Sequence, residues 1–130
     1  MTEAPLSRIL YVDDDDNIRA VAVFSLELVG GFEVAACGSG EEALKRAPEF
    51  DPQLLLLDVM MPEMDGPAVL AALRQSPGTL STPAIFMTAT VQPAEVARLR
   101  ALGAIDVIAK PFDPMQLPQT IRAAWDKHAG

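Results

Sequence analysis

The sequence predicts an α/β fold: a five-stranded parallel sheet in the order 2-1-3-4-5, with five helices on both faces. Short apolar runs of strand length alternate with segments of helical periodicity, as in chains built from repeated strand–helix units. One run, Leu54–Leu57, consists of four leucines, which is typical of a strand buried on both faces. Right-handed crossovers leave few topologies, and of the two common doubly wound orders this one fits the number of strands.

Five apolar runs are the predicted strands, because each has strand length and lies between polar or glycine-containing segments. In chain order they are Ile9–Val12, Phe32–Cys37, Leu54–Leu57, Ala84–Met87 and Ile105–Ala109.

The segments between these runs carry apolar residues at helical spacing. The predicted helices centre on Ile18–Val29, Ala43–Ala47, Val69–Leu73, Val96–Leu102 and Leu117–Ala124. Ser39–Glu42 and Asp113–Gln116 have the pattern of capping boxes, and Pro67 and Pro93 suit first turns. Pro118 removes a hydrogen bond early in the last helix, which predicts that this helix is kinked or begins late.

Composition is that of a globular domain. Half of the residues are apolar and 22% are charged, too hydrophobic a balance for a disordered chain. No apolar run approaches the roughly 20 residues that cross a bilayer, and the N-terminus lacks the features of a secretory signal. A single cysteine, Cys37, excludes an intramolecular disulfide and fits a reducing compartment. We expect one cytoplasmic domain over residues 1–130, with no effector domain and no membrane partner.

Charge argues against nucleic-acid and nucleotide binding. The net charge of −8, from 18 acids and 10 bases, repels phosphate backbones, so we expect no nucleic-acid partner for this domain alone. The first strand is followed by Asp13–Asp16 instead of a glycine-rich phosphate loop, and no P-loop motif is present.

Candidate functional residues follow the strands at their carboxyl ends, where parallel α/β proteins bind ligands. Asp13 and Asp14 follow the first run, Asp58 the third, Thr88 the fourth and Lys110 the fifth. The switch point of the order 2-1-3-4-5 lies between strands 1 and 3. Since neighbouring strands are about 4.8 Å apart, the three acids should converge.

Three converging carboxylates repel one another unless a cation joins them. Oxygen ligands without histidine or cysteine favour a hard cation such as Mg²⁺, with Mn²⁺ as an alternative. Lys110 lies roughly 10 Å from Asp58 in backbone spacing, a gap that its long stem can bridge, and Thr88 adds a hydroxyl donor. A nucleophile, a metal, a cation and a donor are what phosphoryl transfer to a carboxylate requires.

Four segments resemble the receiver domains of two-component response regulators. They are Ile9–Arg19, Leu54–Gly66, Ala84–Ala89 and Gly103–Phe112. The resemblance covers nearly the whole chain, and four motifs in this order and spacing are highly specific. It implies the flavodoxin-like receiver fold and a stand-alone, chemotaxis-type receiver.

By that resemblance, Asp58 is the phosphoacceptor, and Asp13 and Asp14 belong to the metal site. Asp14 is then the more direct ligand, with Asp58 and the backbone carbonyl of Met60 as others. The run of four aspartates leaves the register ambiguous until Ile18–Arg19 is considered. The family places such an apolar–basic pair four and five residues after the second acid, which selects the first two aspartates and leaves the last two to cap or open the first helix.

The resemblance also assigns roles on the other side of the site. Lys110 pairs with the phosphoryl group, Thr88 moves to bond it in the active state, and Ala89 leaves the acceptor open to a phosphohistidine. A cis peptide bond is expected before Pro111. Val107 departs from the family, which often has an aromatic residue there that turns inward. Because the χ1 angle of valine is stiff, we expect a smaller readout.

The expected function is therefore that of a signalling switch. A sensor histidine kinase or histidine phosphotransfer protein phosphorylates Asp58, and a downstream protein binds the face of helix 4, strand 5 and helix 5. A phosphate shuttle or sink is an open alternative. An aspartyl-phosphate phosphatase would need a second aspartate two residues after the nucleophile, where this chain has Met60. Met60 has no group to orient water, which predicts slow self-dephosphorylation. An adaptor that works without phosphorylation is disfavoured by the complete acidic and lysine positions.

Overall fold

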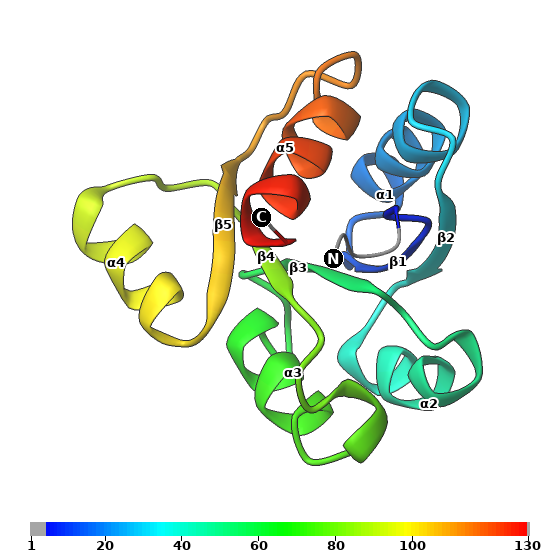
Figure 1. Cartoon of the computed structure of the whole chain (residues 1–130). Helices are drawn as coiled ribbons and strands as arrows, with labels where there is room; N and C mark the ends of the chain where they lie inside the picture. Colours follow the sequence, from blue (N-terminus) through cyan, green and yellow to red (C-terminus); the bar gives the residue numbers. More distant parts are fainter. Residues whose placement is uncertain (1–4, 130) are drawn as a thin grey trace.

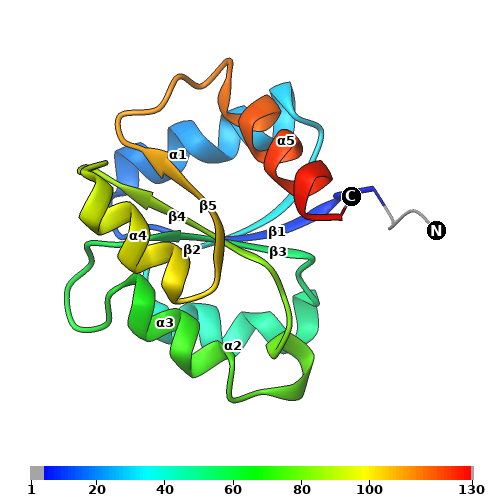
Figure 2. The same cartoon turned by 60° about the vertical axis from the view of Figure 1, so that its left-hand side comes forward.

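The computed structural model describes residues 5–129, which form a central parallel sheet between two layers of helices (Figures 1 and 2). The strands are β1 (Arg8–Val12), β2 (Glu33–Cys37), β3 (Leu54–Asp58), β4 (Ala84–Thr88) and β5 (Ala104–Ala109). All neighbouring strands are parallel, and their order is β2-β1-β3-β4-β5. The predicted fold class and strand order are confirmed.

In the described part of the chain, five helices connect or follow the strands. They are α1 (Asp16–Phe24), α2 (Gly40–Phe50), α3 (Gly66–Leu73), α4 (Pro93–Ala101) and α5 (Leu117–Ala129). Two short turns accompany them, the π-helical η1 (Ser25–Val29) after α1 and the 3-10 helical η2 (Pro77–Thr79) after α3. None of the helices within residues 5–129 is long and apolar enough to cross a membrane.

Local signals account for most helix starts. Asp15, Ser39 and Asp65 each accept a hydrogen bond from the backbone N–H three residues on, so they are the N-caps of α1, α2 and α3. The box predicted at Asp113 precedes a turn and not the helix itself, and its carboxylate accepts from Met115 N–H at 2.9 Å. Helix α5 begins at Leu117, which is the late start that Pro118 predicted.

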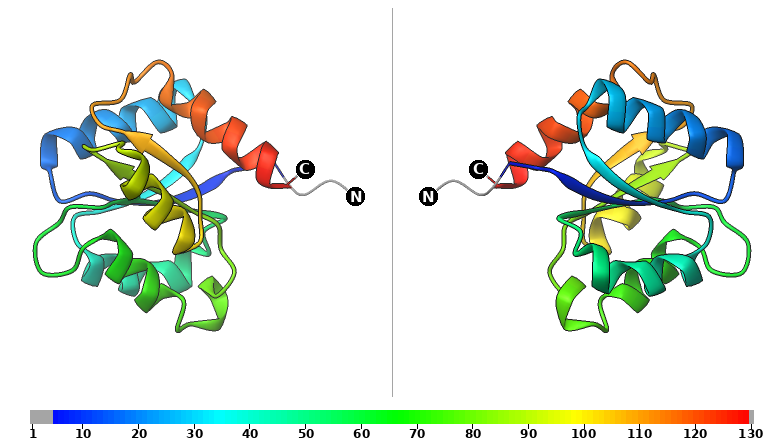
Figure 3. Two further views of the ribbon diagram at one scale, coloured as in Figure 1. Left: turned by 90° about the vertical axis from the view of Figure 1, so that its left-hand side faces the viewer. Right: turned by 90° about the vertical axis from the view of Figure 1, so that its right-hand side faces the viewer.

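Alternation along the strands divides the core into two layers. In β3, Leu55 and Leu57 pack in the layer of α2 and α3, whereas Leu54 and Leu56 pack in the layer of α1 and α5. The α4 residue Leu99 belongs to the first of these layers. All five residues of β3 are buried, as expected for the central strand. The carboxyl ends of the strands gather at the end of the sheet opposite the C-terminal end of α5 (Figure 3).

Candidate metal centre at the carboxyl ends of the strands

Three carboxylates meet where β1 and β3 end. One oxygen of each of Asp13, Asp14 and Asp58 lies within 4.8 Å of the other two. The pairing of Val12 with Leu57 places the next residue of each strand at the same edge. Asp13 is fully buried, Asp58 is 4% exposed and Asp14 is exposed. The convergence predicted from strand order is therefore present, with one acid open to solvent.

Lys110 supplies the positive charge of the cluster. Its Nζ atom lies 3.3 Å from Asp13 Oδ2 and 3.2 Å from Asp58 Oδ1, so the ammonium bridges the two buried acids. The backbone N–H of Lys110 donates to the Thr88 carbonyl at 2.9 Å, and the predicted cis bond to Pro111 is present. Burial alone would lower the pKa of Lys110, but the two carboxylates outweigh it and raise that pKa above its ordinary value.

The surroundings of Asp58 make it a weaker acid than an ordinary aspartate. Burial first, and the charge of Asp13 second, raise its pKa from 3.8 to about 6, although Lys110 opposes the shift. Three acids thus face one ammonium, and the excess negative charge is largely out of water. A divalent cation would relieve this repulsion. Because every donor is a carboxylate oxygen, the set fits Mg²⁺ or Mn²⁺ better than a softer metal.

The Asp13 carboxylate is held by groups that the sequence analysis did not use. Its Oδ2 atom accepts from the Tyr11 hydroxyl at 2.9 Å, and its Oδ1 atom accepts from Asp15 N–H at 3.0 Å. The Arg19 guanidinium donates to the Asp13 carbonyl at 2.8 Å. Tyr11 precedes Asp13 by two residues, and the period of two along a strand is the signal that could have placed both on one face.

The loop after β3 folds back tightly beneath Asp58. Gly66 N–H donates to the Val59 carbonyl at 3.0 Å. A Cβ atom at Gly66 would lie only 2.5 Å from the Asp58 carbonyl oxygen, so this close approach requires glycine. Met60 lies in the same loop with a 75% exposed side chain. The metal role expected for its backbone carbonyl stays a prediction.

The two residues that the resemblance links to switching, Thr88 and Val107, lie on the neighbouring strands. Thr88 is buried at the end of β4, and its hydroxyl accepts from Thr90 N–H at 3.2 Å, a bond within its own loop. Val107 is half-buried in β5, opposite Phe86 of β4. The structure therefore places Thr88 beside β3 but does not join it to the acids by a hydrogen bond.

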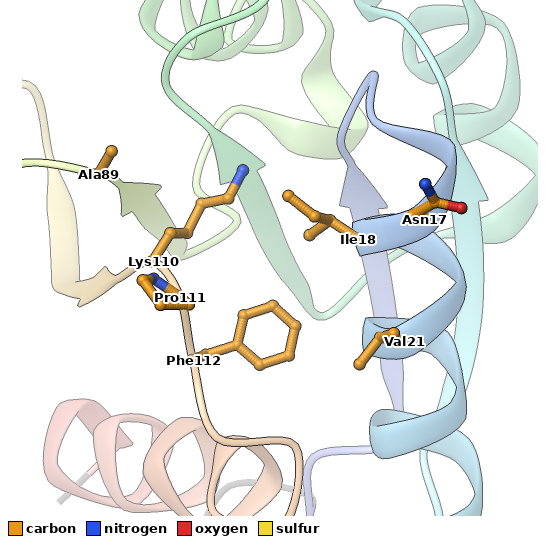
Figure 4. A pocket seen from close by; sticks show the side chains of 7 residues that line it. All are labelled: Asn17, Ile18, Val21, Ala89, Lys110, Pro111 and Phe112. Atoms are coloured by element: carbon orange, nitrogen blue, oxygen red, sulfur yellow. The ribbon is translucent and has the colours of Figure 1, made fainter.

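An apolar pocket of about 540 Å³ adjoins the acid cluster. Its lining residues are Asn17, Ile18, Val21, Ala89, Lys110, Pro111 and Phe112. Figure 4 shows the Phe112 ring pointing toward the α1 side chains Ile18 and Val21, with the Lys110 ammonium directed away from the ring. Lys110 thus lies between the apolar wall of this pocket and the acid cluster.

Residues 9–122 match the model of the response regulator receiver domain. This span contains the acid cluster and Lys110. The chain belongs to this family. The receiver is 37% identical over 116 residues to the alkaline phosphatase synthesis transcriptional regulatory protein PhoP of Bacillus subtilis, a match covering 89% of this chain and 47% of that protein. It is 38% identical to the DNA-binding response regulator MtrA of Mycolicibacterium smegmatis, a match covering 89% of this chain and 49% of that protein.

Solved structures show the same architecture. The chemotaxis protein CheY4 of Vibrio cholerae has a TM-score of 0.84 and 30% identity, with 92% of this chain and 98% of that one covered. The BeF3-activated DrrB receiver domain has a TM-score of 0.77 and 26% identity, with 92% and 97% covered. The receiver spans about half the length of the curated relatives it matches, and nearly the whole length of these solved chains. Its family is that of two-component signalling switches.

Proposed function

We propose that the receiver accepts a phosphoryl group on Asp58 from a histidine kinase or histidine phosphotransfer protein, in a Mg²⁺-dependent reaction. The observation that supports this most is the placement of Lys110 Nζ 3.2 Å from Asp58 Oδ1, beside two further carboxylates. A nucleophilic carboxylate, a paired cation and oxygen ligands for a hard metal are what this reaction needs.

In the transfer step, an Asp58 carboxylate oxygen attacks the phosphorus of the donor's phosphohistidine. The new O–P bond forms as the N–P bond breaks, and the electron pair of that bond returns to the imidazole nitrogen. Lys110 moves from the Asp58 carboxylate to the oxygens of the transferred phosphoryl group. Its positive charge offsets their negative charge. Asp13, Asp14, Asp58 and the Met60 carbonyl would hold Mg²⁺, which would neutralise charge on the phosphoryl oxygens.

The apolar pocket beside the acids supports a protein donor. Val21 and Phe24 of α1 are 45% and 55% exposed, so the apolar wall of the pocket continues onto the helix surface. Exposed apolar surface of this kind marks protein contacts. A helix that presents a phosphohistidine can cover this surface while the phosphoryl group reaches Asp58.

We assign the output to the face built from α4, β5 and α5, with Thr88 as the residue that couples it to phosphorylation. Arg100 of α4 pairs with Asp106 of β5 at 3.1 Å on this face, which ties the two elements together. A downstream protein that distinguishes the two states of Thr88 would bind here. A receiver that only shuttles or stores phosphate would have no such partner, and this outcome is the alternative to output regulation.

We further propose that the receiver works in the cytoplasm without an attached effector, so that it has no nucleic-acid contact of its own. The likeness to the chemotaxis protein CheY4 supports this, whereas PhoP and MtrA, of which this chain covers about half, favour an attached output domain. Intact mass of the native protein separates the two. A mass of 13.9 kDa supports the stand-alone receiver, and about twice that mass contradicts it.

The chemistry is tested by incubation with Mg²⁺ and acetyl phosphate, followed by intact-mass measurement beside Asp58→Asn. We expect a gain of about 80 Da, one HPO₃ unit, in the wild type alone, abolished by chelating the metal. Beryllofluoride, a mimic of the acyl phosphate, identifies a product that hydrolyses too fast to weigh. A folded wild type that neither gains mass nor binds beryllofluoride with Mg²⁺ contradicts the proposal.

A further inference from the structure

We propose that Tyr11 is a positioning residue of the metal site: its buried hydroxyl holds the Asp13 carboxylate in the orientation that Mg²⁺ binding requires. The inference rests on the proposed function, because it assigns a further residue to the same site. It is carried by the hydrogen bond from Tyr11 Oη to Asp13 Oδ2, at 2.9 Å between two fully buried side chains.

Two donors fix the Asp13 carboxylate from opposite ends. Tyr11 bonds Oδ2 from the strand that carries Asp13, and the backbone N–H of Asp15 bonds Oδ1 at 3.0 Å. With both oxygens engaged, the carboxylate cannot turn about its χ2 angle without losing a hydrogen bond in a dry site. Losing one partner of a buried charged group costs more than an ordinary hydrogen bond is worth.

The hydrogen bond from Tyr11 to Asp13 matters most when Lys110 moves away from Asp13. Lys110 Nζ is shared between Asp13 Oδ2, at 3.3 Å, and Asp58 Oδ1, at 3.2 Å. If the ammonium moves toward a phosphoryl group on Asp58, the Asp13 oxygen that it leaves still accepts from Tyr11. The fully buried acid therefore stays solvated by the protein and stays in place as Lys110 changes partner.

The hydroxyl is held in place by the core. Tyr11 is fully buried. Its ring packs in the α1 and α5 layer of the core, which fixes the hydroxyl without help from solvent. Groups that orient metal ligands in this way commonly contribute about 10- to 100-fold to metal affinity.

The test compares Tyr11→Phe, which keeps the ring and removes only the hydroxyl, with the wild type. Isothermal titration calorimetry with MgCl₂ should show Mg²⁺ binding weakened by about tenfold or more. Thr79→Val is the matched control, because the buried Thr79 hydroxyl donates to the Leu73 carbonyl in the loop after α3, away from the acids. It should change Mg²⁺ affinity by less than about twofold. Equal Mg²⁺ affinity in wild type and folded Tyr11→Phe would overturn the inference.

A second readout uses the wild type and therefore does not depend on how well the variant folds. The chain has one tyrosine, so the NMR signals of protein isotopically labelled only at tyrosine report Tyr11 alone. We expect a saturable shift of these signals that follows the calorimetric Mg²⁺ titration. Calorimetric Mg²⁺ binding without that shift overturns the Tyr11 inference and leaves the proposed function standing. A wild type that does not bind Mg²⁺ overturns both.

Discussion

The receiver has two halves that differ in how firmly their functional residues are held. At the ends of β1 and β3, Asp13 is fully buried and accepts from Tyr11, Asp15 and Lys110. At the ends of β4 and β5, the Thr88 hydroxyl has only a bond to Thr90 N–H among the described residues, at 3.2 Å. We call the region of Asp13, Asp14 and Asp58 the acceptor half and the region of Thr88 and Val107 the switch half. Hydrogen bonds hold Asp13 of the acceptor half in place, whereas the Thr88 hydroxyl of the switch half can change its partner.

This contrast separates the chemistry from its readout. A rigid acid cluster gives a cation and a phosphoryl group one geometry to meet, which favours binding and transfer. The threonine can exchange a weak bond in its own loop for a phosphoryl oxygen at small cost. Val107 is half-buried in the switch half, at a position where receivers often have an aromatic ring that turns inward. Substitutions at Val107 should therefore change the readout more than they change phosphoryl transfer.

The largest effect is expected from Gly66→Ala, which changes the close packing beneath Asp58 in the acceptor half. Its new Cβ would lie 2.5 Å from the Asp58 carbonyl oxygen, so the backbone must shift. We expect a loss of about 2 kcal/mol in the free energy of unfolding, together with weaker Mg²⁺ binding. Urea unfolding measures the first and calorimetry the second.

Gly78→Ala is the control for this change, because a Cβ there meets nothing within 4 Å. It should alter the free energy of unfolding by no more than about 0.5 kcal/mol. If both alanine variants behave alike, the close packing beneath Asp58 has no special role.

The next effect is the response of the metal-free protein to pH. Asp58 has its pKa raised from 3.8 to about 6, so folding favours its protonated form. Its contribution to stability is fully present below about pH 4 and is lost as pH rises through about 6. We expect wild type in EDTA to lose on the order of 2 kcal/mol relative to Asp58→Asn across that window.

Urea unfolding at a series of pH values, with and without Mg²⁺, checks this. Added Mg²⁺ should restore the stability above pH 6, because the metal binds the ionised acids. The same pH dependence in wild type and Asp58→Asn would show that another group is responsible.

A smaller effect is expected from Met60→Asn at the rim of the acceptor half. The exposed Met60 side chain cannot orient water, whereas an amide can. We expect the phosphoryl group on Asp58 to hydrolyse several-fold faster in the variant, which corresponds to about 1 kcal/mol. Loss of the mass adduct over time measures the half-life, and a half-life in wild type no longer than in Met60→Asn would sink the prediction of slow self-dephosphorylation.

The smallest chemical effect belongs to Val107→Phe, which sharpens the separation of the two halves. Since Val107 lies within β5 opposite Phe86 and is not part of the acid cluster, phosphorylation by acetyl phosphate should stay within about twofold of wild type. The added ring should enlarge the spectral change of α4, β5 and α5 on beryllofluoride binding, as seen by NMR. A strong change in phosphorylation rate would show that the halves are coupled more tightly than the geometry indicates.

Much of the architecture follows from local features that the sequence displays. The four leucines before Asp58 account for a central buried strand, and Asp15, Ser39 and Asp65 cap helices where capping chemistry places them. The start of α5 was ambiguous, because the signal at Asp113 competed with Pro118. The proline prevailed because it cannot donate a backbone hydrogen bond.

The candidate site likewise has some features that the sequence predicts and others that only the tertiary structure shows. Parallel strands must end at one edge, so the sequence by itself determined that Asp13, Asp14, Asp58 and Lys110 would meet. The tertiary structure alone decided which acid is buried, that Lys110 bridges two of them, and that the Tyr11 hydroxyl serves Asp13. These facts depend on side-chain packing between strands far apart in sequence, and hydrophobic periodicity carries no information about where a hydroxyl or an ammonium comes to rest.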